Sequence, residues 1–194
     1  MEHADRVVSR RFQSEGDAIL LLGGDAVTLG ASEYLKVVCG LVRGVPPSID
    51  LDRERSLQAL LVDLATARLV RSAHDCSDGG LAVTLAECCF DTNGMGAEIA
   101  VDGVNLSPDP ATNRAAALFG ESASRVVASS PVDSVSRVLE RAAAAGVPAR
   151  VVGRTGGARL RVAVGGVMAV DLSIGDAERT WSSAVERHFE KRVA

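Results

Sequence analysis

Three apolar runs rich in β-branched residues follow one another in the last third of the chain, separated only by glycine pairs. The runs are residues 149–155, 158–164 and 167–174, and the pairs are Gly156–Gly157 and Gly165–Gly166. Such runs are typical of β-strands, and a two-residue glycine turn between strands is typical of a hairpin. The sequence therefore predicts two successive hairpins, so part of the sheet must be antiparallel.

Upstream of these runs, strand-like and helix-like segments alternate. We expect strands at residues 17–23, 72–77, 96–101 and 124–130, and helices at about 32–38, 50–69, 80–93, 110–118, 131–145 and 175–189. The helix over 50–69 is indicated by leucines three and four residues apart, as an amphipathic helix requires. Strand–helix units combined with hairpins predict an α+β fold, with a single mixed β-sheet and helices packed on it.

No repeat, low-complexity tract or clear linker divides the chain, whose 194 residues are within the range of one large domain. We expect residues 1–14 to form a loosely ordered lead-in. Residues 15–194 are then expected to form one domain.

Charge and composition exclude some function classes. The net charge is −4, no basic stripe is visible and aromatic residues make up only 3% of the chain, which argues against a nucleic-acid partner. No apolar run approaches the roughly 20 residues that span a bilayer, so no membrane partner is expected. The first residues have no apolar core of a signal peptide. We therefore expect a cytoplasmic location.

The four cysteines form no C-x-x-C pattern and give little support for zinc or disulfides. They are Cys39, Cys76, Cys88 and Cys89. We expect them to be small, buried apolar residues.

The stretch SAHDCSDGGLAVTLAE, residues 72–87, is the main candidate for a binding site. A strand arrives, the chain bends at residues 77–80 and a helix begins. The first turn of a helix has backbone N–H groups without intrahelical partners and a positive dipole end. Gly79 and Gly80 would let a ligand approach the backbone closely. These features together are suited to binding phosphate.

The carboxylates of Asp75 and Asp78 would repel a bare phosphate. They fit the same site if Mg²⁺ lies between carboxylate and phosphate oxygens. The hydroxyl of Ser77 would then donate to a phosphate oxygen.

Two alternatives remain open for this stretch. In the first alternative, Ser77 or Asp78 is simply the N-cap of the helix, Gly79 and Gly80 allow the bend, and no ligand binds there. His74 has the chemistry of a general base, but no nucleophile partner can be identified, which favours a structural role at the strand end.

The stretch LFGESASRVVASS, residues 118–130, is the second candidate. Glu121 and Ser122 at a strand entrance can hold hydroxyls or a phosphate, and Arg125 can pair with an anion. The alternative is a polar turn with a surface ion pair between Glu121 and Arg125.

These two stretches, with the opening segments GDAILLLGG and LGASEYL, resemble the phosphoribosylformylglycinamidine synthase family. More narrowly, they resemble the C-terminal-type domain of its synthetase subunit, from about residue 12 to residue 181. The same type of domain is shared with aminoimidazole ribonucleotide (AIR) synthetase, selenophosphate synthetase and thiamine monophosphate kinase. The resemblance implies a fold like that of the AIR synthetase C-terminal domain.

The resemblance implies an ATP-dependent C–N ligase of de novo purine biosynthesis. Enzymes of this family convert formylglycinamide ribonucleotide to its amidine, with ATP, Mg²⁺ and ammonia from a glutaminase partner. ATP phosphorylates the formamide oxygen, and ammonia displaces the phosphate. The catalytic histidine and most ATP contacts lie in N-terminal-type domains, so the expected partners are the remaining domains of the subunit and the glutaminase subunit. We expect this chain to be a fragment of a longer protein and to be inactive alone.

Roles for individual residues follow from matching the motifs. Asp75 is implied as the Mg²⁺ ligand, and Ser77 is implied to contact the phosphates of the nucleotide, ATP or ADP. From the chemistry of the bend we expect Asp78, Gly79 and Gly80 to belong to the same nucleotide site. A substrate-binding role is implied for Glu121 and Ser122 by internal pseudosymmetry of the subunit, and we expect Arg125 to join them because it can pair with an anion. No residue of this chain is assigned as catalytic, and His74 does not match the catalytic histidine of the family.

Two other functions remain as alternatives. One is a non-catalytic structural or interaction domain. The other is another enzyme of the AIR synthetase superfamily such as selenophosphate synthetase, although the FGESASR segment argues against it.

Overall fold

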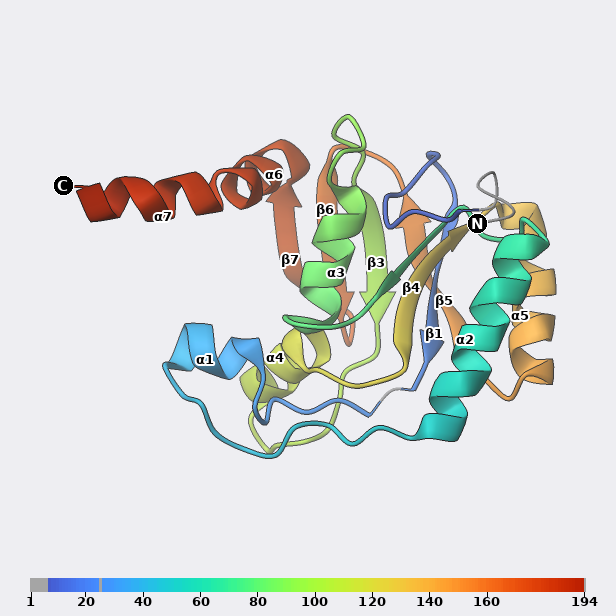
Figure 1. Cartoon of the computed structure of the whole chain (residues 1–194), viewed down its shortest axis with the longest axis horizontal. Coiled ribbons are helices and arrows are strands. Elements are labelled where there is room, and N and C mark those ends of the chain that lie inside the picture. The colour runs from blue at the N-terminus through green and yellow to red at the C-terminus, as the bar shows by residue number, and fades with distance from the viewer. Residues whose placement is uncertain (1–6, 25, 194) are drawn as a thin grey trace.

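The structure, a computed structural model, describes residues 7–24 and 26–193, without the side chains of residues 190–193. It contains one seven-stranded sheet flanked by helices (Figure 1). The strands are β1 (Ala18–Gly23), β2 (Ser72–Asp75), β3 (Ala97–Val101), β4 (Arg125–Ser130), β5 (Ala149–Thr155), β6 (Arg159–Val164) and β7 (Val167–Ser173). The helices are α1 (Glu33–Cys39), α2 (Leu51–Thr66), α3 (Gly80–Cys89), α4 (Pro110–Phe119), α5 (Val135–Ala144), α6 (Ile174–Ser182) and α7 (Ala184–Val193), and a 3₁₀ turn (Val132–Ser134) precedes α5.

The sheet is mixed, which confirms the expected α+β class. Its strand order is β2-β4-β1-β5-β3-β6-β7. The pair β3–β6 is parallel, and the other neighbouring strands are antiparallel. The glycine pair Gly165–Gly166 forms the expected hairpin, because Val164 of β6 lies opposite Val167 of β7.

The other predicted hairpin is wrong, because β3 lies between β5 and β6. The turn at Gly156–Gly157 crosses the start of β3, where the Gly96 N–H donates to Gly157 O at 2.6 Å and the Gly156 N–H donates to Gly96 O at 2.8 Å. A Cβ atom on Gly96 would lie 2.1 Å from the backbone oxygen of Arg159. The chain can therefore pass at this point only with glycine at position 96.

Strand β1 is buried on both faces, which accounts for its uninterrupted apolar sequence. Ile19 and Leu21 belong to a core formed with α3, α4 and α6, and Leu20 and Leu22 belong to a second core formed with α2 and α5. Helices α2 and α5 lie side by side on their face of the sheet (Figure 1). The single sheet thus separates two helical layers.

Helix α2 forms as its sequence predicts. The Asp50 side chain caps it by accepting from the N–H groups of Asp52 and Arg53 at 3.0 and 3.1 Å. Three of the four leucines at helical spacing are buried: Leu57, Leu60 and Leu64. None of the described helices has both the length and the apolar character needed to cross a bilayer.

The C-terminal helix differs from the prediction. One helix was expected over residues 175–189, but the chain divides at Ser183 into α6 and α7. Figure 1 shows α7 projecting from the body of the molecule. Helix α3 is also shorter than expected, because the backbone becomes extended at Phe90 (φ −78°, ψ 152°).

Part of the expected lead-in contacts the sheet and α3. Residues 1–6 lie outside the described residues. Phe12 is 2% exposed, and its N–H donates to Cys88 O at 2.9 Å. Ser9 forms a β-bridge with Ser72 at the start of β2. Residues 9–12 therefore have defined positions, and a domain start at residue 15 stays a prediction.

Three cysteines are buried as expected, but Cys39 at the end of α1 is exposed. Burial raises the pKa of the Cys76 and Cys88 thiols, and it raises the pKa of Cys89 to about 12. Because the thiolate is the nucleophilic form, these three thiols should be unreactive in the folded chain.

We predict that a thiol reagent at neutral pH labels Cys39 rapidly in the folded chain and the other three cysteines only after unfolding. Peptide mass spectrometry after timed labelling would measure this. The variant Cys39→Ser serves as the control and should show no rapid labelling. Labelling of Cys88 or Cys89 as fast as Cys39 would contradict the burial described here.

Candidate functional site

The two candidate stretches of the sequence lie around one cleft of about 460 Å³. Asp75–Asp78 form one side of the cleft, and Glu121–Arg125 form another. Strand pairing brings them together, because Asp75 at the end of β2 lies opposite Val126 of β4. The Cys76 N–H also donates to the backbone oxygen of Arg125 at 2.8 Å.

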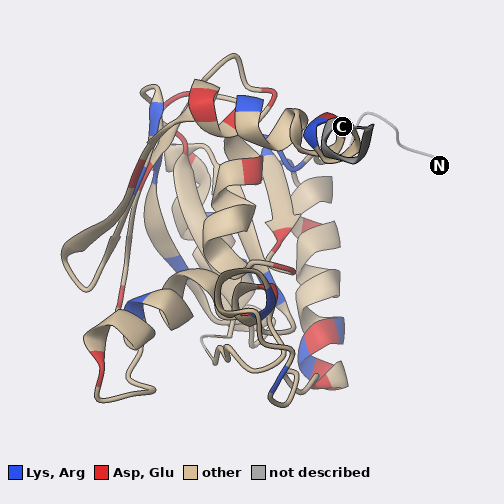
Figure 2. Cartoon of the chain, turned by 90° about the vertical axis from the view of Figure 1, so that its left-hand side faces the viewer, with Lys and Arg blue, Asp and Glu red and all other residues tan. Residues whose placement is uncertain are grey.

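Helix α2 forms a third side of the cleft and contributes an acidic residue that the sequence patterns did not indicate. The Ser124 hydroxyl donates to Glu54 Oε2 at 2.6 Å. Glu54 lies three and seven residues before Leu57 and Leu61, which share its helix face, and this spacing is the signal that could have identified it. Figure 2 shows acidic and basic residues together on the first turn of α2.

The bend after β2 is held by an unexpected group. The N-cap of α3 is Gly79 (φ 80°), with no side-chain capping bond, so an N-cap role for Ser77 or Asp78 is wrong. Instead, Glu121 Oε1 accepts from the Gly79 N–H at 3.1 Å. Ser77 and Asp78 are exposed and line the cleft, whereas Gly79 is buried. Their side chains are therefore available to a ligand.

The glycines of the bend permit close packing of the protein backbone. Gly80 (φ 64°) crosses the turn that follows α4, and a Cβ atom there would lie 2.7 Å from the oxygen of Gly120. A Cβ atom on Gly79 would lie 2.5 Å from the Val83 side chain. The glycine pair therefore has a packing role, whatever contact it makes with a ligand.

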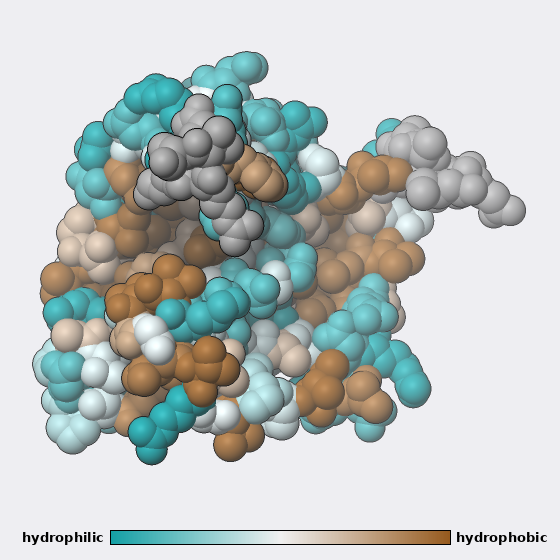
Figure 3. All heavy atoms as spheres, turned by 60° about the vertical axis from the view of Figure 1, so that its left-hand side comes forward, coloured by the Kyte–Doolittle hydropathy of each residue, from teal (hydrophilic) through white to brown (hydrophobic). Residues whose placement is uncertain are grey.

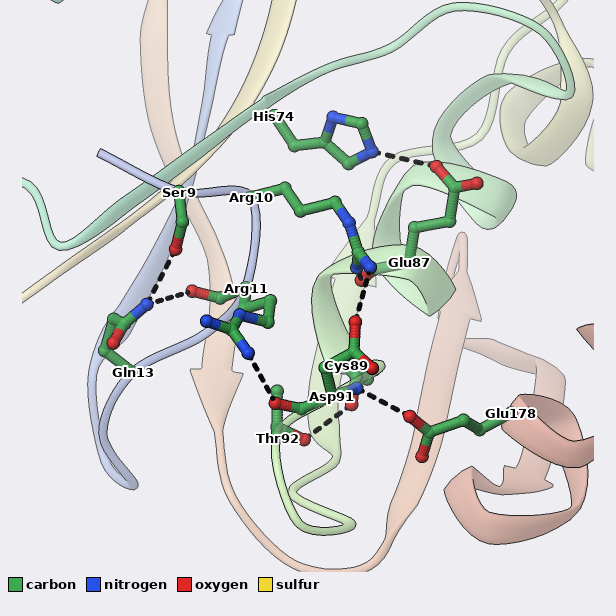
Figure 4. Close-up of polar contacts among 10 residues, drawn as sticks. All are labelled: Ser9, Arg10, Arg11, Gln13, His74, Glu87, Cys89, Asp91, Thr92 and Glu178. Carbon is green, nitrogen blue, oxygen red and sulfur yellow. Dashed lines mark hydrogen bonds and ion pairs between the residues drawn. The ribbon is translucent and has the colours of Figure 1, made fainter. Parts of the chain in front are cut away.

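The side chain of His74 points toward Glu87 of α3 (Figure 4). Its Nε2 lies 2.8 Å from Glu87 Oε2, and its Nδ1 lies 3.3 Å from Asp75 Oδ1. The ring is 17% exposed and does not line the cleft. This placement supports the structural role over a general base, with His74 linking the end of β2 to α3.

The same, C-terminal end of α3 is tied to the N-terminal segment and to α6, as Figure 4 shows. Arg10 donates to the backbone oxygen of Glu87 and pairs with Asp91 at 2.7 Å. The Asp91 N–H donates to Glu178 Oε1 at 2.6 Å. Helix α3 is thus held at its start by the bond from Gly79 to Glu121 and at its end by these contacts.

The turn before β4 supplies a hydroxyl and a cation to the cleft. Ser122 Oγ is inaccessible to solvent and has no hydrogen-bond partner among the described residues. Arg125 is only 6% exposed, so the alternative of a surface ion pair with Glu121 is wrong. Both residues line the cleft. A buried guanidinium at this position favours an anionic ligand.

A larger cleft of about 760 Å³ adjoins the first. The two share six lining residues: Pro47, Ile49, Leu57, Ser122, Ala123 and Ser124. The second cleft extends to Gly23–Gly24 and to Val147–Pro148. Together they can accommodate a ligand larger than the first cleft alone.

An exposed apolar segment lies beside the mouth of the clefts. It comprises α1 and the chain up to α2, and its large exposed side chains are Val37, Val38, Leu41, Val42, Val45, Ile49 and Leu51. Apolar side chains gather on the lower half of the face in Figure 3, the side on which α1 lies. Exposed apolar patches of this kind mark binding surfaces.

Comparisons with known proteins agree with this architecture. Residues 14–165 match the family described as AIR synthase related protein, C-terminal domain. The phosphoribosylformylglycinamidine synthase subunit PurL of Moorella thermoacetica is 40% identical over 174 residues, which cover 90% of this chain and 23% of that protein. The chain spans about a quarter of the length of the curated relatives that it matches.

Two solved structures share the fold. T. maritima PurL complexed with FGAR matches with a TM-score of 0.75 and 21% identity, over 90% of this chain and 30% of that one. T. maritima PurL complexed with ATP matches with a TM-score of 0.70 and 22% identity, over 90% of this chain and 28% of that one. At this level of identity the likeness shows the fold alone.

We predict that Ser124→Ala raises the pKa of Glu54 toward its ordinary value, because the bond from Ser124 is the main cause that holds this pKa below it, followed by the bond from Gln58. A depressed pKa in the folded state means that ionised Glu54 adds stability above its unfolded pKa, which is lost as pH falls through the folded pKa. NMR titration of the Glu54 carboxyl group measures the effect.

The control for this experiment is Ser136→Ala, which removes an exposed hydroxyl on α5 and should leave the pKa of Glu54 unchanged. An equal Glu54 titration in Ser124→Ala and the wild-type chain would show that the bond is not formed in solution.

Proposed function

The chain belongs to the family of AIR synthase related proteins, as a C-terminal domain, and we propose that it forms one such domain of a phosphoribosylformylglycinamidine synthase. That enzyme would be an ATP-dependent ligase that converts formylglycinamide ribonucleotide to its amidine in purine biosynthesis. The observation that carries the proposal is the meeting of the HDCSDGG bend and the FGES turn on one cleft. The relative of 40% identity, named as a subunit of this enzyme, supports it.

We propose that the cleft binds the phosphates of ATP or ADP. Ser77 and Ser122 line it with hydroxyl-bearing side chains, the Ser122 hydroxyl being buried without a hydrogen-bond partner among the described residues, and Arg125 supplies positive charge. Hydrogen bonds between charged groups and phosphate are among the stronger ones, and hydroxyl donors add direction. The carboxylates of Asp75 and Asp78 line the same cleft. Because they would repel the phosphates, a cation would have to bind between the carboxylates and the phosphates.

The acidic residues fit a Mg²⁺ ion that shares its ligands with the nucleotide. The described residues contain no group of three or more His, Cys, Asp or Glu side chains arranged for a metal. Mg²⁺ is commonly held by one or two carboxylates together with phosphate oxygens and water. Asp75, whose side chain is 70% exposed, would be the protein ligand, with Asp78 beside it. The ion would neutralise phosphate charge when bound.

In the proposed reaction the γ-phosphoryl group of ATP passes to the formamide oxygen, and ammonia then forms the new C–N bond as phosphate leaves. The residues of this chain would hold and orient the nucleotide, and His74 is not available as a base because it faces α3. The groups that react with the substrate would come from the other domains of the subunit. A glutaminase subunit would supply the ammonia.

The apolar segment from Val37 to Leu51 is the surface on which we place another domain of the subunit. Ile49 of this segment also lines both clefts, so a domain covering the segment would close the clefts from solvent. Such closure strengthens the electrostatic contacts between the cleft and phosphate.

We predict that the chain binds Mg²⁺-ATP and that Asp75→Asn weakens binding by about tenfold, the equivalent of one charge-assisted contact. Isothermal titration calorimetry with and without Mg²⁺ measures the change, and the loss should fall on the Mg²⁺-dependent part. Asp133→Asn, an exposed aspartate in the 3₁₀ turn, is the matched control. Equal affinity of Asp75→Asn and wild type would instead favour a domain with a purely structural role.

We also predict that the purified chain alone forms no amidine from formylglycinamide ribonucleotide, ATP and ammonia, because the reacting groups would lie in other domains. Release of phosphate that depends on the ribonucleotide is the measurement. Turnover by the chain alone, abolished by Asp75→Asn, would contradict the proposed division of labour.

A further inference from the structure

The carboxylate of Glu121 holds together segments that are far apart in the sequence. Its Oε1 accepts from the N–H of Gly79 at 3.1 Å and from the N–H of Glu33 at 3.0 Å. Its backbone exchanges two hydrogen bonds with Thr28, at 2.9 and 3.1 Å. One residue thus joins the starts of α1 and α3 to the chain after β1 and to the turn before β4.

Helix α1 depends strongly on this contact because none of its residues is buried. Tyr34 of α1 also stacks on Phe119, with ring centroids 5.1 Å apart. Phe119 directly precedes the turn that carries Glu121. Both contacts therefore hold α1 to the same short stretch of chain.

Helix α1 also carries a cation, Lys36, whose charge acts on the acidic bend. Lys36 pairs with Glu33 at 2.7 Å, which is the main cause of the raised pKa of Lys36, and Asp78 adds to the rise. Lys36 is therefore close enough to Asp78 for their charges to interact. The position of α1 determines where this cation lies relative to the bend.

The carboxylate of Glu121 also occupies the hydrogen-bonding position at the start of α3 that an anionic ligand would otherwise take. N–H groups at the start of a helix favour an anion, and the carboxylate already satisfies that of Gly79. Ser77, Ser122 and Arg125, which line the cleft from two segments, remain as candidate donors to a phosphate there.

We propose that Glu121 is a positioning residue, whose carboxylate sets the bend at Ser77–Asp78 and α1 relative to each other without touching a ligand. This role replaces the substrate contact that the family resemblance implies for Glu121. It rests on the proposed function only for its effect on nucleotide binding, because the cross-link itself is a property of the fold.

Two substitutions separate positioning from direct contact. Glu121→Gln keeps the length of the side chain and a carbonyl oxygen that can accept from both amides, but it removes the charge. Glu121→Asp keeps the charge and is one methylene shorter, so it cannot reach both amides. Positioning requires reach, whereas contact with a cation or a ligand hydroxyl through the carboxylate requires charge.

The measurements are amide hydrogen exchange at Gly79 and Glu33 by NMR, and the affinity for Mg²⁺-ATP. We expect Glu121→Gln to stay close to wild type in both. We expect Glu121→Asp to speed exchange at both amides by about tenfold or more and to weaken nucleotide binding. Glu98→Gln, an exposed residue of β3 paired with Arg161, is the control and should change neither.

Two results would overturn the proposal. One is retention of slow exchange at both amides in Glu121→Asp. The other is loss of affinity in Glu121→Gln while both amides stay protected, which would show direct contact through the charge. If the wild-type chain binds no Mg²⁺-ATP, the proposed nucleotide site fails, and the exchange rates of the two variants still decide the role of Glu121.

Discussion

The pairing of β2 with β4 is the interaction on which the candidate site depends. Strand β2 lies at the edge of the sheet and has β4 as its one neighbouring strand in the sheet order. Its register places Asp75 opposite Val126, with Asp75 exposed at the cleft and Cys76 buried beneath it. Because side chains alternate along a strand, a slip by one residue would exchange these two environments. The register of the four residues of β2 therefore determines which side chains are exposed at the cleft.

Local features of the fold could be predicted because local sequence determines them. Asp50 caps α2, and the glycine pair at 165–166 closes a hairpin, each through contacts within a few residues. The insertion of β3 between β5 and β6 could not be predicted in this way. It depends on pairing with residues more than 50 positions away, and the glycine pair at 156–157 has the same local pattern as a true hairpin turn.

The same distinction applies to the site. The motif HDCSDGG correctly indicated that Asp75 and Ser77 face a cleft, since the strand, bend and helix around them are contiguous. The sequence did not show that Glu54 joins them or that Glu121 bonds to two helix starts, because those contacts join residues 42 to 88 positions apart. The residue type of Glu121 suggested that its carboxylate binds a ligand. In the structure this carboxylate instead accepts hydrogen bonds from two backbone N–H groups of the protein.

The crossing of Gly80 over Gly120 has a mechanical consequence. Backbone atoms of the two segments are in such close approach that a side chain at position 80 would clash with Phe119 and Gly120. The bend and the end of α4 therefore cannot move closer together. A molecule entering the cleft would meet a preformed wall, and adaptation to its shape would fall to side-chain rotation and to the long connection between α1 and α2.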